Sequence, residues 1–312
     1  MVAAGRALGS RFPDPSMRNP DTLADKIIGP EELALIELHP IAGAVADTTG
    51  ATPAYEAAGT AVMMLIRTKF IDEKLERAVA NGARQVVILG AGFDTRAYRF
   101  QELLAGLKIF EVDSEATQQY KRRRAEAALG QPPANLTHVS VDFHHDKLWD
   151  VLTRAGWDPK VRTFFTWEGV SMYVAEAGVR ETLRTIARAA SGSTLVMDYT
   201  TQAVLDFMNK FPQFGPSKFL DAWGEPWVFG LEDGKEREFF AEVGLDVVEL
   251  FSLFSPDAIK RYLTRPDGTV FGVPSPEQRP KLPEEAESAA ALMSQKGSSF
   301  YTLAELRVPE HN

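Results

Sequence analysis

The most informative segment of the chain is Gln85-Val86-Val87-Ile88-Leu89-Gly90-Ala91-Gly92-Phe93-Asp94-Thr95-Arg96. Residues 85–89 form a short, mostly apolar and largely β-branched run, and a glycine closes it. Such runs are typical of strands that are buried on both faces, as the strands of parallel sheets are. The glycines let the backbone turn sharply and approach a ligand without an intervening side chain. The segment therefore predicts a buried strand that ends in a glycine-opened turn.

Similar apolar segments follow this one along the chain, and helical patterns separate them. The segments cover residues 108–113, 136–141, 163–167 and 194–199, and the helical patterns cover 114–129, 143–155 and 175–190. Strands that alternate with helices predict right-handed crossovers and a doubly wound, mostly parallel sheet of the Rossmann-like α/β class. Residues 245–252 and 300–308 predict two further strands, which makes the sheet seven-stranded.

The remaining segments suggest how the chain is organised. We expect a flexible arm over residues 1–20 and one domain over 21–312, with N-terminal helices in 21–82, a cofactor-binding core in 83–200 and cap insertions in 201–244 and 256–298. Connections this long are uncommon in compact domains unless they form lids or binding elements. The first insertion is rich in Phe and Trp, which either line an acceptor pocket or bury the insertion's own helices.

Composition excludes several classes of protein. The 312 residues include 43 acidic and 34 basic side chains and no cysteine. A general nucleic-acid binder needs a basic face, and a disulfide framework, a thiolate metal site or a thiol nucleophile needs cysteine. No run approaches the roughly 18 apolar residues of a membrane span, and the first twenty residues lack the apolar run of a signal peptide. We expect a cytoplasmic protein without nucleic-acid or membrane partners.

Acidic residues follow the first two predicted strands at the edge where an open parallel sheet binds ligands. Asp113 ends the second strand about twenty residues after the glycine turn, where a carboxylate can accept the hydroxyl hydrogens of a ribose. A nicotinamide dinucleotide uses the same plan, but its fingerprint has a third glycine where this chain has Thr95. Asp94 would also repel phosphates. The pattern favours phosphate-free, cationic S-adenosylmethionine and leaves the dinucleotide as the alternative.

Two more strand ends carry residues suited to such a ligand. Asp142 and Phe143 follow the third strand, where a carboxylate can accept from an adenine amino group and an aromatic ring can stack. Glu168 and Gly169 follow the fourth. Asp94, Asp113 and Asp142 could each instead cap a helix N-terminus. Their recurrence at successive strand ends favours a ligand site.

Five segments together resemble the leucine carboxyl methyltransferase family. They are Arg67-Thr68-Lys69-Phe70-Ile71-Asp72, Gly90-Ala91-Gly92-Phe93-Asp94-Thr95-Arg96, Glu111-Val112-Asp113, Val141-Asp142-Phe143 and Glu168-Gly169-Val170-Ser171-Met172-Tyr173, in the family's order. The resemblance covers residues 54–200 well and the rest in outline. It implies a class I methyltransferase sheet whose last strand is antiparallel to the others, and S-adenosylmethionine as cofactor.

The resemblance also implies a role for each matching position. Arg67 would contact the donor's carboxylate, Gly90, Ala91 and Gly92 its methionine part, Asp113 the ribose, Asp142 and Phe143 the adenine, and Glu168 the amino-acid end. Phe143 stands where the family often has leucine. We expect Asp94 and Arg96 to form an ion pair that holds the turn.

The sequence leaves the methyl acceptor and the catalytic groups open. Bacterial members of the family modify carboxylates or hydroxyls of small molecules such as polyketides, and the aromatic insertion favours a bulky apolar one. A protein C-terminal carboxylate, a nicotinamide oxidoreductase and a non-catalytic S-adenosylmethionine binder are the alternatives. A hydroxyl acceptor would need a base. His144, Tyr173, Asp198 and Tyr199 are candidate polar groups of the pocket, and no residue cluster predicts a metal.

Overall fold

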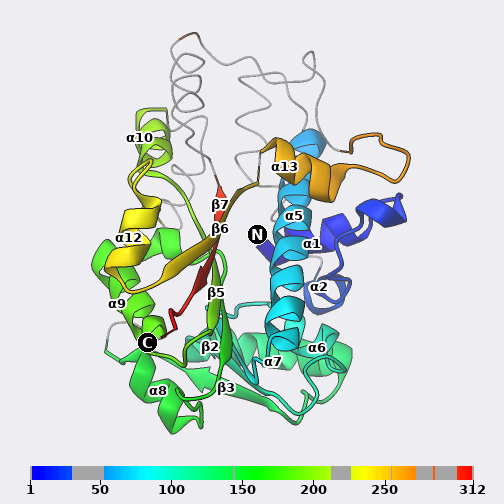
Figure 1. The fold of residues 1–312 in the computed structure, drawn as a ribbon. Helices are drawn as coiled ribbons and strands as arrows, with labels where there is room; N and C mark the ends of the chain where they lie inside the picture. Colours follow the sequence, from blue (N-terminus) through cyan, green and yellow to red (C-terminus); the bar gives the residue numbers. More distant parts are fainter. Residues whose placement is uncertain are drawn as a thin grey trace.

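A central sheet lies between two layers of helices in the computed structural model of the chain (Figure 1). The structure describes residues 2–29, 53–142, 145–211, 226–253, 255–271, 284 and 301–310, and the backbone alone for 53–59. In Figure 1, α5 with α1, α2, α6 and α7 covers one face, and α8, α9 and α12 cover the other.

The seven strands fall close to where the sequence predicts them. They are β1 (Gln85–Leu89), β2 (Lys108–Asp113), β3 (Leu136–Ser140), β4 (Thr163–Trp167), β5 (Thr194–Tyr199), β6 (Asp246–Ser252) and β7 (Thr302–Arg307). The helices are α1 (Val2–Ser10), η1 (Pro15–Met17), α2 (Ala24–Ile27), α5 (Pro53–Ala80), α6 (Arg96–Arg99), α7 (Glu115–Leu129), α8 (Leu148–Arg154), η2 (Ser171–Tyr173), α9 (Glu176–Ala187), α10 (Gln202–Lys210), α12 (Glu236–Glu242), α13 (Pro256–Ala258) and the π-helical turn η4 (Ile259–Leu263).

The order of the strands confirms the predicted fold class. The sheet runs β3-β2-β1-β4-β5-β7-β6. Strands β1 to β5 pair in parallel, and β7 is antiparallel to both β5 and β6. The order reverses beside β1, between β2 and β4, so the ligand crevice of such a sheet lies at the carboxyl ends of these strands. The antiparallel last strand is the one that the family resemblance implies.

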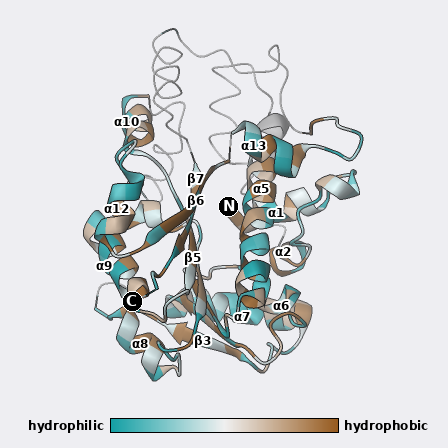
Figure 2. Cartoon of the chain, in the orientation of Figure 1, coloured by the Kyte–Doolittle hydropathy of each residue, from teal (hydrophilic) through white to brown (hydrophobic). Residues whose placement is uncertain are grey.

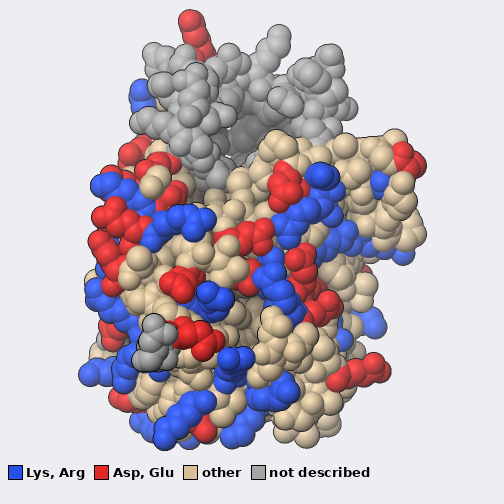
Figure 3. Space-filling model, in the orientation of Figure 1, with Lys and Arg blue, Asp and Glu red and all other residues tan. Residues whose placement is uncertain are grey.

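Alternating side chains of each strand enter two separate cores. Val87 and Leu89 of β1 join the core beneath α8, α9 and α12, whereas Val86 and Ile88 join the core beneath α5. Because both faces of the central strands are buried, they are apolar nearly throughout. Figure 2 shows this as hydrophobic strands between helices of mixed character. Lys, Arg, Asp and Glu are interspersed over the molecular face in Figure 3.

The N-terminal segment corrects one prediction. In place of a flexible arm over residues 1–20, Val2–Ser10 is a helix that packs on α5. A Cβ on Gly5 would lie 2.8 Å from Met64 Cγ, and one on Gly9 would lie 3.1 Å from the Asn19 Cβ. Two glycines four residues apart share one helix face, so their missing side chains allow this close approach. Gly5 and Gly9 are therefore packing residues of this helix.

The predicted cap insertions lie only partly within the described residues, since 212–225, 272–283 and 285–300 fall outside them. Of the first insertion, Val228 N and Phe229 N donate to the Met172 carbonyl of η2. The second insertion contacts the N-terminal segment, where Arg265 Nε lies 2.5 Å from Asp14 Oδ2. The first insertion therefore adjoins η2, which follows β4, and the second adjoins the segment that follows α1. No helix among the described residues is long and apolar enough to cross a membrane.

Candidate active site

The glycine turn after β1 is built as a backbone wall. Gly90 has φ +62° and Gly92 φ +42°, the left-handed region that favours glycine. A Cβ on Gly90 would lie 2.3 Å from Val170 Cγ2, so a larger residue would displace the chain that follows β4. The turn therefore needs glycine for both its backbone conformation and its close contact.

A cavity of about 560 Å³ opens beside this turn. Its lining comes from the turn after β1, from the segment after β4 and from α1: Val2, Ala3, Arg6, Ile88, Leu89, Gly90, Ala91, Gly92, Phe93, Asp94, Glu168, Gly169, Val170 and Tyr173. Most of these groups are backbone or apolar, with two carboxylates and one guanidinium among them. Such a mixture is typical of sites for small molecules.

Asp113 joins the cavity wall to the second strand. Its Oδ2 accepts from Gly92 N at 2.6 Å, and its Oδ1 accepts from Ser114 N at 2.7 Å. The cap of α7 is Ser114, whose hydroxyl accepts from Thr117 N, so Asp113 is not the N-cap residue. Each carboxylate oxygen retains lone-pair capacity for the hydroxyls of a ribose.

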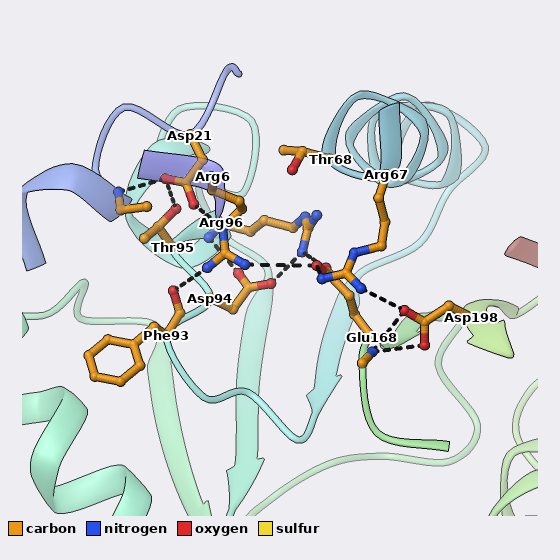
Figure 4. Close-up of polar contacts among 12 residues, drawn as sticks. Arg6, Asp21, Arg67, Thr68, Phe93, Asp94, Thr95, Arg96, Glu168 and Asp198 are labelled. Carbon is orange, nitrogen blue, oxygen red and sulfur yellow. Dashed lines mark hydrogen bonds and ion pairs between the residues drawn. The ribbon is translucent and has the colours of Figure 1, made fainter. Parts of the chain in front are cut away.

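Glu168 lies at the centre of a ring of three arginines (Figure 4). Its carboxylate is 2.8 Å from Arg67 Nη2, 2.9 Å from Arg96 Nη1 and 3.8 Å from Arg6 Nη1. Burial would raise the pKa of Glu168, but Arg67, Arg96 and Arg6 together lower it well below its usual range. Glu168 is therefore ionised at neutral pH, and its charge is fixed at the cavity edge.

Arg96 ties this ring to the turn. It forms ion pairs with Asp72, at 2.8 Å, and with Asp94. The expected Asp94–Arg96 pair is thus confirmed, although Asp94 also lines the cavity. Asp94 Oδ1 accepts from Arg96 N at 2.7 Å, so this carboxylate covers the N-terminus of α6.

The structure brings most of the sequence-predicted residues to one edge of the sheet. Arg67 stands directly behind the cavity wall, since the Cβ position of Gly169 is 3.7 Å from Arg67 Nη1. Asp142 adjoins Asp113, because Val141 N donates to the Asp113 carbonyl, and its exposed side chain lies 2.9 Å from His145 Nδ1. Phe143 and His144 lie outside the described residues.

The two candidate tyrosines, Tyr173 and Tyr199, lie in different places. Tyr173 lines the cavity, where its ring meets Trp227 edge-on at 6.5 Å. Tyr199 is 1% exposed in the core beneath α9 and α12, and burial raises its pKa well above the usual range. Odd-numbered side chains of β5 face that core, so the prediction of Tyr199 as a pocket group is wrong. Within the described ranges, no group of His, Cys, Asp and Glu side chains could hold a metal ion.

Arg6 is the functional candidate that sequence reasoning missed. It lines the cavity, lies 2.7 Å from Asp21 and donates to the Phe93 carbonyl at 2.8 Å. The signal was present as Gly5-Arg6-Ala7-Leu8-Gly9, a pattern whose two glycines mark one face for close helix packing. A single arginine among small apolar residues on such a helix lies near the packed interface.

Comparison with known proteins identifies the family of the chain. The model of the family described as "Leucine carboxyl methyltransferase" matches residues 1–187. The chain belongs to this family. The predicted family is thereby confirmed. Relatives of the chain are named for S-adenosyl-L-methionine-dependent methyl transfer.

Bacterial relatives carry provisional names as S-adenosyl-L-methionine-dependent methyltransferases. One from Mycolicibacterium smegmatis is 36% identical over 65% of this chain and 66% of its own length. One from Streptomyces avermitilis is 33% identical over 54% of this chain and 58% of its own. The chain thus matches less than two thirds of the length of these relatives.

Two solved structures share the fold over nearly the whole chain. A provisionally named methyltransferase from Thermobifida fusca has a TM-score of 0.55 and 14% identity, and covers 99% of this chain and 95% of its own. A DUF574 family protein from Streptomyces avermitilis has a TM-score of 0.51 and 17% identity, with 99% and 97% covered. At these identities the likeness concerns the fold alone.

Proposed function

We propose that the chain is an S-adenosylmethionine-dependent O-methyltransferase that acts on a carboxylate or hydroxyl of a small, apolar molecule. The observation that carries the proposal is the position of Asp94, whose carboxylate occupies the helix N-terminus beside the glycine turn. A cationic, phosphate-free nucleoside fits a cavity walled by this group, by Glu168 and by bare backbone.

The same observation argues against a dinucleotide. Dinucleotide sites of this plan place the pyrophosphate at the N-terminus of the helix after the first strand. Here that helix, α6, has four residues, and its first N–H donates to the Asp94 carboxylate. A phosphate at this place would meet a negative charge in place of a free donor.

The residues present fit the methyl donor. Asp113 would hold the ribose hydroxyls, Gly90, Ala91 and Gly92 would border the thioether chain, and Glu168 and Arg67 would face its amino-acid end. Arg67 Nε is buried and makes no hydrogen bond within the described part of the chain, which leaves a donor for the ligand's carboxylate. Asp142 and Phe143 would contact the adenine.

S-Adenosylmethionine, when bound, supplies a methyl group already activated by a positive sulfur. The protein's part is to hold an acceptor oxygen in line with that group and to exclude water, and proximity of this kind contributes several kcal/mol. A carboxylate acceptor is ionised at neutral pH and needs no base. A hydroxyl acceptor would need a base, and among the candidate groups that the sequence offers for this role Tyr173 lines the described cavity.

The acceptor side of the cavity supports an apolar small molecule. Val2, Ala3 and Val170 line it, and Tyr173 with Trp227 adds aromatic surface. Trp227 belongs to the first insertion, so the described part of the predicted cap lies against the cavity residue that would meet the acceptor.

Calorimetry tests the cofactor, with Asp113→Ala as the decisive variant. We expect wild-type protein to bind S-adenosylmethionine but not NAD⁺, and Asp113→Ala to lose this binding. The control is Asp246→Ala, an exposed side chain of β6 that should leave binding unchanged. Binding of NAD⁺ without binding of the methyl donor would overturn the proposal.

Turnover separates an enzyme from a protein that only binds the donor. We expect S-adenosylhomocysteine to form when the protein is supplied with S-adenosylmethionine and a panel of apolar carboxylic acids and phenols. Donor binding with no product across the panel would favour the non-catalytic alternative.

A further inference from the structure

We infer that Asp198 and Tyr301 are positioning residues that set the Arg67–Glu168 corner for the amino-acid end of the methyl donor. This inference rests on the proposed function. Both residues lie beyond residue 187, outside the segment that the family model matches.

Asp198, at the end of β5, holds the backbone after Glu168. Gly169 N donates to its two carboxylate oxygens at 2.8 and 2.9 Å, and Ser171 Oγ donates to its carbonyl at 2.5 Å. The side chain is fully buried on the α5 side of the sheet. Because Gly169 lines the cavity, the carboxylate fixes a stretch of cavity wall.

The same carboxylate orients Arg67. Arg67 Nη1 donates to Asp198 Oδ2 at 3.0 Å while its Nη2 lies 2.8 Å from Glu168 Oε1. Figure 4 shows the guanidinium descending from α5 between the two acids. Held at both terminal nitrogens, its plane is fixed and the remaining Nε is placed by these contacts.

Tyr301 closes the network from the far end of the chain. Its hydroxyl donates to Asp198 Oδ2 at 2.6 Å and accepts from Arg67 Nη1 at 2.7 Å. Burial raises the pKa of Tyr301 well above its usual range, so the hydroxyl keeps its proton and remains a donor. The residue stands directly before β7, so the antiparallel last strand brings it to the site.

Two ligands that differ only in the amino-acid group test this role. S-Adenosylhomocysteine carries the group, and 5′-methylthioadenosine lacks it. We expect Tyr301→Phe to weaken S-adenosylhomocysteine binding roughly tenfold, as loss of a hydrogen bond to a charged group does. Binding of 5′-methylthioadenosine should change less than about twofold. Calorimetry with both ligands gives the comparison.

Matched variants identify the source of any loss. Tyr199→Phe removes a buried hydroxyl from the opposite face of β5 and should affect neither ligand. Asp113→Ala should weaken both ligands, because both carry the ribose. A Tyr301→Phe variant that weakens both equally, or neither, would overturn the inference.

Thermal unfolding of each variant accompanies the binding data. If Tyr301→Phe does not fold, Asp198→Asn takes its place with the same two ligands, and an equal loss for both again overturns the inference. Failure of the proposed function has a different signature, since wild-type protein would then bind neither ligand.

Discussion

Two glutamates, Glu168 directly after β4 and Glu111 within β2, have little exposure to solvent, yet their pKa values are shifted in opposite directions. The Glu168 side chain is 10% exposed and the Glu111 side chain 1%. Glu168 faces three arginines, and its pKa is lowered despite burial. Glu111 faces one lysine, Lys121 at 2.7 Å, and burial raises its pKa despite that partner.

The difference shows how many countercharges a buried carboxylate needs. Burial penalises the ionised form in both places, and a single cation does not offset the penalty at Glu111. At Glu168, several cations do. The ring of arginines therefore keeps an anion at the cavity edge, whereas the Glu111–Lys121 pair lies beneath the site as a structural link between β2 and α7.

The largest effect is expected for Glu168→Gln. The substitution leaves Arg67 and Arg96 without a shared anion, and breaking a buried ion pair of this kind costs about 5 kcal/mol of unfolding free energy. Urea unfolding at pH 7 measures it. Because the pKa of Glu168 is lowered in the folded state, its contribution is present above the ordinary pKa near 4.5 and is lost as the pH falls further.

The difference in unfolding free energy between wild type and Glu168→Gln should therefore become smaller in acid. The control is Glu176→Gln, which alters an exposed ion pair with Arg180 and should change stability by less than about 1 kcal/mol. A gap that stays constant from pH 7 to pH 3 would contradict the electrostatic origin of the effect.

A smaller loss is expected for Lys121→Met. Glu111 would remain buried without its cation, at a cost of about 3 kcal/mol at pH 7. Since the pKa of Glu111 is raised, its stabilising form is the protonated one, and stability is lost as the pH rises through the folded-state value. The destabilisation of Lys121→Met relative to wild type should thus become smaller in acid, where protonation removes the uncompensated charge of Glu111. The destabilisation of Glu168→Gln also becomes smaller in acid, but there because the wild type loses a stabilising charge.

The double variant Glu111→Leu with Lys121→Met distinguishes the two regions. Replacing a buried ion pair by apolar residues is often neutral or stabilising. We expect the double variant to unfold within about 1 kcal/mol of wild type in urea. If the double variant were as unstable as Lys121→Met alone, the ion pair would stabilise the fold by more than the mutual compensation of its two buried charges.

The sequence predicted the sheet and the acidic strand ends well because both depend on local signals. Period and β-branching mark each strand, and the glycines of the turn have a backbone reason to be there. The Asp94–Arg96 ion pair followed from adjacency along the chain. The roles of Arg6 and Tyr301 could not be predicted in this way, because Arg6 donates to Phe93, 87 residues away, and Tyr301 donates to Asp198, 103 residues away.

The two errors have different physical causes. Residues 1–20 are predicted as a flexible arm, whereas Gly5 and Gly9 let Val2–Ser10 pack closely on α5 as a helix. Tyr199 was placed in the pocket because it ends a strand, but adjacent residues of a strand face opposite sides. Asp198 and Tyr199 divide accordingly, one toward Arg67 and the other into the core.

The smallest effect concerns His138, which faces Glu111 across the β2–β3 register. Its Nδ1 lies 3.5 Å from Glu111 Oε2, but burial, with Lys121 and Arg122, lowers the pKa of His138 to about 4. The ring is therefore neutral at pH 7 and adds no second countercharge. We expect His138→Gln to change the free energy of unfolding by less than about 1 kcal/mol at pH 7.

The pH dependence makes this small effect decisive. A lowered histidine pKa means that the unfolded chain takes up a proton first, so the wild type loses stability as the pH falls from 6.5 toward 4. His138→Gln lacks that loss and should become more stable relative to wild type at pH 5 than at pH 7, by urea unfolding at both. If the variant instead became less stable relative to wild type in acid, His138 would be a protonated partner of Glu111. Glu111 would then have a second countercharge, and it would differ less from Glu168 in this respect.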